Sequence, residues 1–361
     1  MAEFAALAGH EDLLSGLWRA ARQGRLPHAL LFHGPPGIGK FAAGLRLVQG
    51  LLCERARGGV PCATCRACKQ ALSLNHLDLF VLDVAHEDVP EDKRQENIRL
   101  DRVVRRSGPG AWEGPVIEEF LSLRAAEGGW RAIVVREAER LRHSQNEAQN
   151  ALLKMLEEPG TRVLWILETA HPDALLPTVR SRCVPVRLEP PGPDEALAVL
   201  ERHGIDRGQA LALARWAAGS PGGALALHRR AAHTFRPLLE ALLSGRRSAL
   251  DAAREVWETQ GRFLGKTPSA RARDQARAFL DLAIDVVGDQ LRLACGAWAQ
   301  ALAHGDIALT GPAPRPGALR GVLEVLLAAR ADLERNLDPQ VLVDEALLAL
   351  AGGAAAIGAR G

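Results

Sequence analysis

The stretch from Gly34 to Phe41 reads Gly-Pro-Pro-Gly-Ile-Gly-Lys-Phe and has the spacing of a phosphate-binding loop. In the complete pattern, Gly-x4-Gly-Lys-Ser/Thr, backbone N–H groups surround phosphates, the lysine reaches them, and the hydroxyl helps to hold Mg²⁺. The phosphate-binding part of the pattern is intact and consists of Gly34, Gly37, Gly39 and Lys40. Phe41 has no oxygen to offer a metal. We therefore expect a loop that either binds nucleotide weakly or has only a structural role, and that does not support ATP hydrolysis.

A second metal-binding group is also replaced. Phosphate-loop ATPases place an aspartate, often followed by a glutamate, after a later strand to help hold Mg²⁺. The corresponding strand is predicted at Ala132–Val135, and Arg136 occupies the position of the aspartate. A guanidinium group binds anions and cannot ligate a cation. The alternative is that Arg136 is a solvated residue at the strand end and that Glu137 or Glu139 takes over the metal.

Four cysteines form a compact C-x8-C-x2-C-x2-C pattern: Cys53, Cys62, Cys65 and Cys68. Four thiolates suit tetrahedral Zn²⁺ in a closed, structural site, and such a metal can fold a segment that is too short to have its own core. An iron–sulfur cluster is a weaker alternative, because the ferredoxin pattern places its fourth cysteine downstream and before a proline. Unliganded thiols are the third alternative. Cys183 and Cys295 are expected to be ordinary buried, small hydrophobic residues.

The glycine-rich loop, Arg136 and the cysteines must be positioned by the strands and helices of the fold. Short apolar runs alternate with helical patterns in this part of the sequence. Five runs are predicted strands: Ala29–His33, Leu79–Val84, Ala132–Val135, Val163–Leu167 and Val184–Leu188. Ala42, Leu45 and Val48 share one face of an expected helix after the glycine-rich loop. This alternation predicts a parallel sheet covered by helices. The loop follows the first strand and precedes a helix, which is the context that phosphate binding requires.

The alternation ends near a proline- and glycine-rich hinge at 190–193, and the remaining chain has helical periodicity. We therefore predict an α/β domain at 1–189 with a zinc module inserted at 53–68, a small helical lid at 190–231, and an all-α domain at 232–361. His86–Gln95 and Ser107–Pro115 are expected to be solvated loops. A chain of 361 residues is long enough for two or three domains.

Composition limits the possible partners and location. The chain is 47% hydrophobic and 24% charged, with a formal net charge of +2, so contact with nucleic acid would have to come from a local patch. The first residues do not have the pattern of a secretory signal, and no apolar run approaches the length of a membrane span. We expect a cytoplasmic protein that makes no membrane contact.

Several further segments together resemble the clamp-loader ATPases of the AAA+ class. Ser181-Arg182-Cys183 resembles the family's Ser-Arg-Cys signature, and Asn150–Pro159 matches its Asn-Ala-Leu-Leu-Lys-x-Leu-Glu-Glu-Pro helix. The other matching segments are Leu26–Gly34, Asn75–Phe80 (with Leu77 in place of a proline) and Ala218–Gly222. The resemblance covers roughly residues 1–227. It implies an AAA+ P-loop parallel-sheet domain, a small helical lid and a C-terminal helical collar through which subunits form a ring.

Within this family the chain resembles the delta-prime subunits of the bacterial DNA polymerase III clamp loader, which combine a cysteine zinc module with a damaged nucleotide site. The resemblance implies that Arg182 reaches the ATP site of a neighbouring subunit, and that the partners are gamma/tau and delta subunits, the sliding clamp and primed DNA. One alternative is a catalytic, gamma/tau-like ATPase that uses Glu137 for the metal. Another is a zinc-dependent DNA-binding module; Arg66 and Lys69 lie near the cysteines, but no Trp or Phe alternates with them.

Overall fold

The chain divides into two compact units, which are described separately below. The computed structural model describes residues 9–83, 98–108, 111–123, 125, 129–141, 146–217, 219–229, 234–259, 263, 267–297, 304, 307, 315–335 and 337–358. The first unit comprises Met1–Arg207 and Gly219–Gly222, and the second comprises Gly208–Ala218 and Gly223–Gly361. In the described residues, no helix has both the length and the apolar character needed to cross a bilayer.

A five-stranded parallel sheet forms the centre of the first unit, with the order β2-β3-β4-β1-β5. The strands are β1 (Ala29–His33), β2 (Leu79–Leu82), β3 (Arg131–Val135), β4 (Val163–Thr169) and β5 (Val184–Arg187). Because all strands run in the same direction, the loops that follow them meet at one edge of the sheet. The glycine-rich loop, Asp83 and Arg136 all follow strands directly, so they share this edge.

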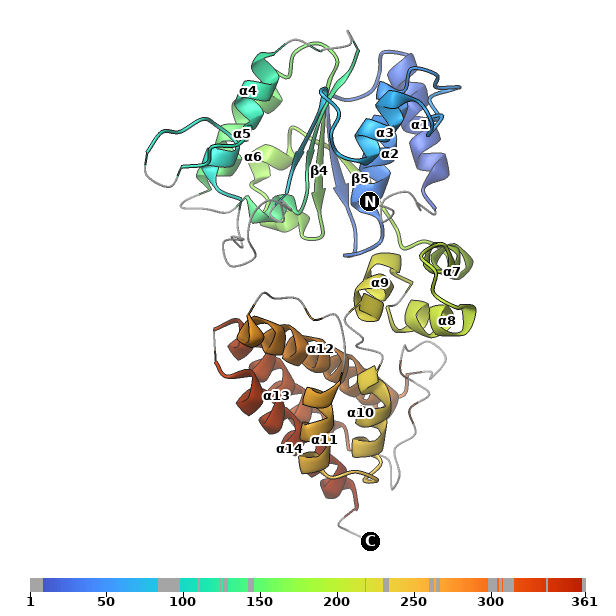
Figure 1. Ribbon diagram of the computed structural model, residues 1–361, viewed down its shortest axis with the longest axis vertical. Helices are drawn as coiled ribbons and strands as arrows, with labels where there is room; N and C mark the ends of the chain where they lie inside the picture. The colour runs from blue at the N-terminus through green and yellow to red at the C-terminus, as the bar shows by residue number, and fades with distance from the viewer. Residues whose placement is uncertain are drawn as a thin grey trace. The chain divides into compact units, whose positions relative to one another are not determined.

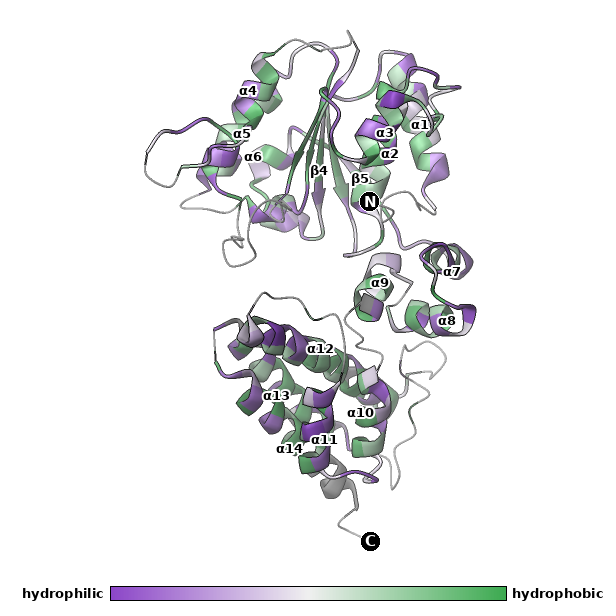
Figure 2. Cartoon of the chain, viewed as in Figure 1, coloured by the Kyte–Doolittle hydropathy of each residue, from purple (hydrophilic) through white to green (hydrophobic). Residues whose placement is uncertain are grey.

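Helices cover both faces of the sheet, which explains why its inner strands β1, β3 and β4 are mostly apolar rather than alternating (Figures 1 and 2). One face packs against α1 (Glu11–Arg22), α2 (Lys40–Leu52) and α3 (Arg66–Leu72). The opposite face packs against α4 (Ile117–Ser122), α5 (Glu147–Glu157) and α6 (Pro177–Arg180). Short 3₁₀ turns lie between these elements: η3 (Leu100–Arg102), η4 (Ala138–Arg140) and η5 (Pro172–Ala174).

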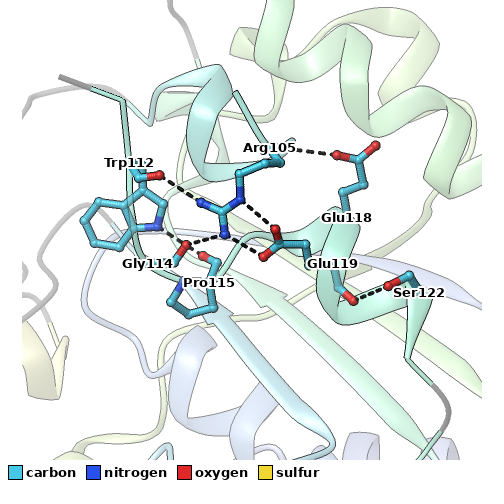
Figure 3. Close-up of polar contacts among 7 residues, drawn as sticks. All are labelled: Arg105, Trp112, Gly114, Pro115, Glu118, Glu119 and Ser122. Atoms are coloured by element: carbon cyan, nitrogen blue, oxygen red, sulfur yellow. Dashed lines mark hydrogen bonds and ion pairs between the residues drawn. The ribbon is translucent and has the colours of Figure 1, made fainter. Parts of the chain in front are cut away.

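The described part of the predicted Ser107–Pro115 loop is ordered by the side chain of Arg105 (Figure 3). The guanidinium forms a two-pronged ion pair with Glu119 of α4, with both N···O distances at 2.6 Å. It also donates to the carbonyl oxygens of Trp112 and Gly114, each at 2.9 Å. The Trp112 indole N–H donates to the Pro115 carbonyl at 3.1 Å. The segment is a loop, as predicted, but polar contacts from α4 and Arg105 fix its path.

The first unit also contains α7 (Pro193–Arg202), whereas α8 (Arg207–Trp216) and α9 (Pro221–Arg229) lie mostly in the second unit. The remaining helices of the second unit are α10 (Phe235–Leu243), α11 (Ala249–Glu258), α12 (Pro268–Ala294), α13 (Pro316–Glu334) and α14 (Pro339–Gly358). They pack around one core that contains Phe235 and Phe279, whose rings meet edge to face at 5.8 Å. Leu319, Leu326 and Leu333 project into this core from α13, in agreement with the helical period of the sequence.

The predicted fold class, a parallel α/β sheet followed by all-α structure, is confirmed. All five predicted strands are present, but β3 begins one residue earlier and β4 extends two residues further than predicted. β2 ends at Leu82 and β5 at Arg187, short of the predicted ends; Val84 and the predicted His86–Gln95 loop lie outside the described residues. The division at 189 and 231 stays a prediction, because the two compact units do not separate the lid from its neighbours.

Candidate functional site

The glycine-rich loop joins β1 to α2 and presents the N-terminus of α2 at the carboxyl edge of the sheet. Gly34 has a φ of 151°, and a Cβ at this position would lie 2.3 Å from the Leu188 carbonyl oxygen, so only glycine fits against β5. The Lys40 ammonium donates to the carbonyls of Gly34 at 3.0 Å and Pro35 at 2.8 Å. Burial lowers the pKa of Lys40, and the carboxylate of Glu168 opposes this shift. The loop therefore has the shape of an anion site, and its own carbonyls hold the lysine.

The two positions at which the sequence pattern of phosphate-loop ATPases has magnesium ligands hold side chains that contact each other. Phe41, in the first turn of α2, is only 5% exposed. The guanidinium carbon of Arg136 lies 4.3 Å from the centroid of the Phe41 ring, which is the distance of a cation–π contact. Arg136 also pairs with Asp83 at 2.5 Å, because Leu82 and Val135 are register partners at the ends of β2 and β3. A stacked cation therefore stands where the family pattern places a metal-binding aspartate and hydroxyl.

Glu168, which the sequence analysis did not single out, adds an acidic group beside these cations. It pairs in register with Phe32 of β1, and the two side chains share the face of the sheet that packs on α2. Its Oε2 atom is inaccessible to solvent and has no hydrogen-bond partner among the described residues. Burial raises the pKa of Glu168 to about 7, although Arg136 and Lys40 both favour its charged form. Glu168 therefore exchanges its proton near neutral pH, beside Lys40 and Arg136.

The alternative metal ligands suggested by the sequence have other contacts. Glu137 has a left-handed backbone, with a φ of 44°, and its carboxylate pairs with Arg140 at 2.5 Å. Glu139 accepts a hydrogen bond from the backbone N–H of Ala170 at 3.4 Å. Both carboxylates lie close enough to affect the charge of Lys40. Glu137 is therefore engaged by Arg140 rather than held free as a replacement for the missing aspartate.

A glycine- and serine-containing turn at Gly219–Gly222 contacts the outer side of the phosphate loop. The backbone N–H of Gly222 donates to the Gly37 carbonyl at 2.8 Å, and the Ser220 hydroxyl donates to the Pro36 carbonyl at 3.1 Å. These contacts use loop carbonyls, so they leave the loop N–H groups available. The turn belongs to the first compact unit although α8 and α9 on either side of it lie mostly in the second.

The four cysteines of the predicted zinc module lie together, with all four Sγ atoms within 4.8 Å of one another. Cys53 follows α2, and Cys65 caps α3 by accepting a hydrogen bond from the Cys68 N–H at 3.4 Å. The Sγ atoms of Cys53 and Cys65 are 3.9 Å apart, close to the roughly 3.8 Å edge of a tetrahedron with Zn–S distances near 2.3 Å. The cluster can hold a metal ion such as Zn²⁺.

The electrostatics of the cluster also fit a bound cation. Hydrogen bonds from the backbone at Thr64 and Cys65 lower the pKa of Cys62 to about 5, whereas burial raises the pKa of Cys68. A divalent ion would stabilise the Cys68 thiolate that burial disfavours. Because α2 separates Cys53 from Lys40 by about 20 Å of helix, this cluster is distinct from the phosphate loop.

The cysteine segment packs directly on α1 and α2. The Gln49 side-chain amide donates to the Cys68 carbonyl at 2.9 Å, and the Trp18 indole N–H donates to the Leu47 carbonyl at 3.1 Å. A Cβ on Gly59 would lie 2.3 Å from the Trp18 Cβ, so the segment and the tryptophan are in close contact. A metal at the cysteines would therefore stabilise the same body that carries the phosphate loop.

Arg182 lies at the opposite edge of the sheet from the phosphate loop. It precedes β5, whose Val184 pairs with Leu30, and about 13 Å of strand separates Leu30 from Gly34. Its guanidinium donates to the Thr178 carbonyl at 2.9 Å and pairs with the carboxylate of Glu157. Its side chain is 33% exposed. Arg182 therefore lies apart from the phosphate loop of its own chain, and its side chain is partly open to solvent.

Asp83, Glu168 and Glu157 are residues that the sequence analysis missed. Glu168 gave a usable signal, since it is an acidic residue in an otherwise apolar strand. Asp83 and Glu157 were harder to recognise from the sequence, because each is identified by an ion pair with a distant arginine. Asp83 pairs with Arg136, 53 positions away, and Glu157 pairs with Arg182, 25 positions away.

Comparisons with known proteins identify the family and the fold. A family model described as DNA polymerase III, delta subunit, matches residues 9–192. The delta-prime subunit of DNA polymerase III from Escherichia coli is 36% identical over 205 residues, covering 56% of this chain and 55% of that protein. The Pseudomonas aeruginosa delta-prime subunit is 34% identical over 175 residues, covering 48% and 47%. The Escherichia coli tau subunit is 33% identical over 186 residues, covering 52% and 25%.

These alignments span about half the length, or less, of the curated relatives. A solved structure of a DNA polymerase III gamma subunit-related protein from Thermotoga maritima matches over 94% of this chain and 99% of that one, with a TM-score of 0.51 and 18% identity. This likeness concerns the fold alone. The family model covers half of the sequence, including the phosphate loop, the cysteines and Arg182, and the chain therefore belongs to the DNA polymerase III delta-subunit family.

Proposed function

We propose that this chain is a non-hydrolysing, delta-prime-type subunit of a DNA polymerase III clamp loader. In this role it assembles with gamma/tau and delta subunits and helps the complex to load the sliding clamp onto primed DNA. The similarity to delta-prime and tau subunits supports this assignment. The observation that carries the non-hydrolysing role is the stack of Arg136 on Phe41, which fills the place of the metal-binding groups.

Arg182 is the residue proposed to act in catalysis. Its guanidinium would stabilise negative charge that develops on the γ-phosphate of ATP held by an adjacent subunit, an effect worth roughly 10³–10⁵ in rate in well-studied GTPases. Its distance from its own phosphate loop supports a role on a neighbouring subunit. The four cysteines are proposed to hold a structural zinc ion, which would supply folding energy and no chemistry.

The helical bundle of the second unit is proposed as the collar that joins subunits. Val341 and Leu348 of α14 are 62% and 65% exposed and lie seven residues apart, which places them on the same helix face. Leu327 on α13 is also exposed. Exposed apolar side chains on adjacent helices are suited to association with another bundle.

The test uses the chain alone and in the assembled complex. The purified chain with ATP and Mg²⁺ should release no phosphate above background. The complex assembled with gamma/tau and delta subunits should hydrolyse ATP, and Arg182→Ala should lower this rate at least tenfold without loss of assembly as weighed by native mass spectrometry. An unchanged rate in a verified complex would exclude the trans role of Arg182.

The second candidate function is a catalytic, gamma/tau-like subunit. Its support is the identity to tau subunits, which nearly equals the identity to delta-prime subunits. The same experiment separates the two, because a catalytic subunit would hydrolyse ATP by itself and lose this activity on Lys40→Ala.

A further inference from the structure

Arg182 has two anchors, and both come from helices that pack against each other. Nη1 donates to the Thr178 carbonyl in α6, and Nη2 pairs with Glu157, the last residue of α5. The Gln149 side chain of α5 accepts the Leu176 N–H at 2.7 Å and so attaches the start of α6 to α5. The two anchors of Arg182 therefore belong to one packed body.

Glu157 is not placed to stabilise its own helix. The C-terminus of a helix carries partial negative charge, so a carboxylate in the last turn of α5 is unfavourable there. The following Glu158-Pro159 sequence ends the helix and adds a second carboxylate. The contact of Glu157 in the structure is the guanidinium of Arg182, which supplies the compensating positive charge.

The anchored guanidinium keeps donors for a further partner. An arginine head has five N–H donors in a planar fork, and the two anchors use one donor on each Nη. The remaining donors and the 33% exposure of the side chain leave Arg182 able to contact an external phosphate. A long side chain without anchors would lose more conformational freedom each time it engaged that phosphate.

We propose that Glu157 is a positioning residue that holds Arg182 in the orientation required to meet the triphosphate of a neighbouring subunit. This inference rests on the proposed trans role of Arg182. Glu157 does not touch nucleotide and acts only through the arginine. Thr178 contributes through its backbone carbonyl, so the side chain of Glu157 is the part of the arrangement that substitution can remove.

The experiment measures ATP hydrolysis by the complex assembled with gamma/tau and delta subunits, with clamp and primed DNA present. Glu157→Ala should lower kcat about three- to fivefold with KM for ATP unchanged, a size typical of one exposed ion pair. Glu158→Ala is the matched control, because it removes the same charge from the adjacent exposed position; its kcat should stay within about 1.5-fold of the wild type. Glu157→Gln, which keeps the shape, should lie between these values.

A double substitution separates positioning from general damage. In the Arg182→Ala background, Glu157→Ala should produce no further decrease, because there is no guanidinium left to orient. A further decrease of similar size, an unchanged or raised kcat for Glu157→Ala alone, or an equal effect of Glu158→Ala would overturn the positioning role. If Arg182→Ala itself leaves the rate unchanged, the proposed function fails together with this inference. A strong effect of Arg182→Ala with none of Glu157→Ala removes only the inference.

Discussion

Replacing Glu168 with glutamine should stabilise the first unit at alkaline pH and have little effect at acidic pH. Burial raises the pKa of Glu168 from 4.5 to about 7, while Lys40 and Arg136 lower it and Glu137 and Glu139 add to the rise. The folded chain therefore holds this proton up to about pH 7, whereas the unfolded chain releases it near pH 4.5. Raising the pH through this window favours the unfolded state.

The size of this change in the free energy of unfolding follows from the pKa values of Glu168 in the folded and unfolded chain. Their difference corresponds to about 3 kcal/mol of destabilisation once the pH is well above 7. Glu168→Gln removes the titrating group and keeps its shape, so the variant should be more stable than the wild type by up to about 3 kcal/mol at pH 8. The gain should shrink to less than about 1 kcal/mol at pH 5 and vanish below about pH 4.

Urea unfolding at pH 5, 6.5 and 8 tests this expectation, with hydrogen exchange of the β4 amides reporting on the first unit specifically. Glu189→Gln is a suitable control, because its side chain is 74% exposed and its replacement should change stability by less than about 0.5 kcal/mol at any of these pH values. A Glu168→Gln variant that is less stable at pH 8, or whose gain does not depend on pH, would refute the reasoning.

Three further predictions concern the other contacts. Phe41→Thr combined with Arg136→Asp restores both metal-binding groups and should tighten binding of Mg²⁺-ATP at least about tenfold by calorimetry; an unchanged affinity would show that these residues are not the obstacle. Cys65→Ser should reduce bound zinc from about one equivalent to near zero by elemental analysis and lower the melting temperature, whereas the exposed Cys295→Ser should do neither. Arg105→Ala should free the loop that it holds, so that Trp112 becomes more accessible to acrylamide quenching; equal quenching in variant and wild type would contradict this role.

Much of the fold could be predicted from local sequence patterns. Strands buried on both faces are continuous apolar runs, and the first unit shows such runs at β1, β3 and most of β4. The glycine-rich loop was predictable because its backbone angles and close contacts restrict it to glycine at Gly34. The lack of a metal-ligating side chain at Phe41 and Arg136 was also readable, since each position is fixed by its distance from a strand or helix end.

The contacts that complete the site could not be predicted in the same way. The pairing of Arg136 with Asp83 depends on β2 and β3 being neighbours, and strand order is a property of the whole sheet. The pattern also suggested that β4 ends at Leu167, because a charged residue is rarely buried within a strand. Glu168 is an exception, because it lies within β4 at the edge of the sheet that carries the phosphate loop. A residue type that is unusual for its secondary structure, such as a glutamate within a buried strand, is most easily recognised once its neighbours in space are known.

The opposite positions of Arg182 and the phosphate loop give the chain two unlike ends. In the proposed ring, the end with Arg182 would contribute to the ATP site of a neighbouring subunit. The end with the phosphate loop would not form a working ATP site. In that proposed role the chain would lie at one end of a row of active sites, because a subunit placed against its phosphate loop would find no ATP there to act on.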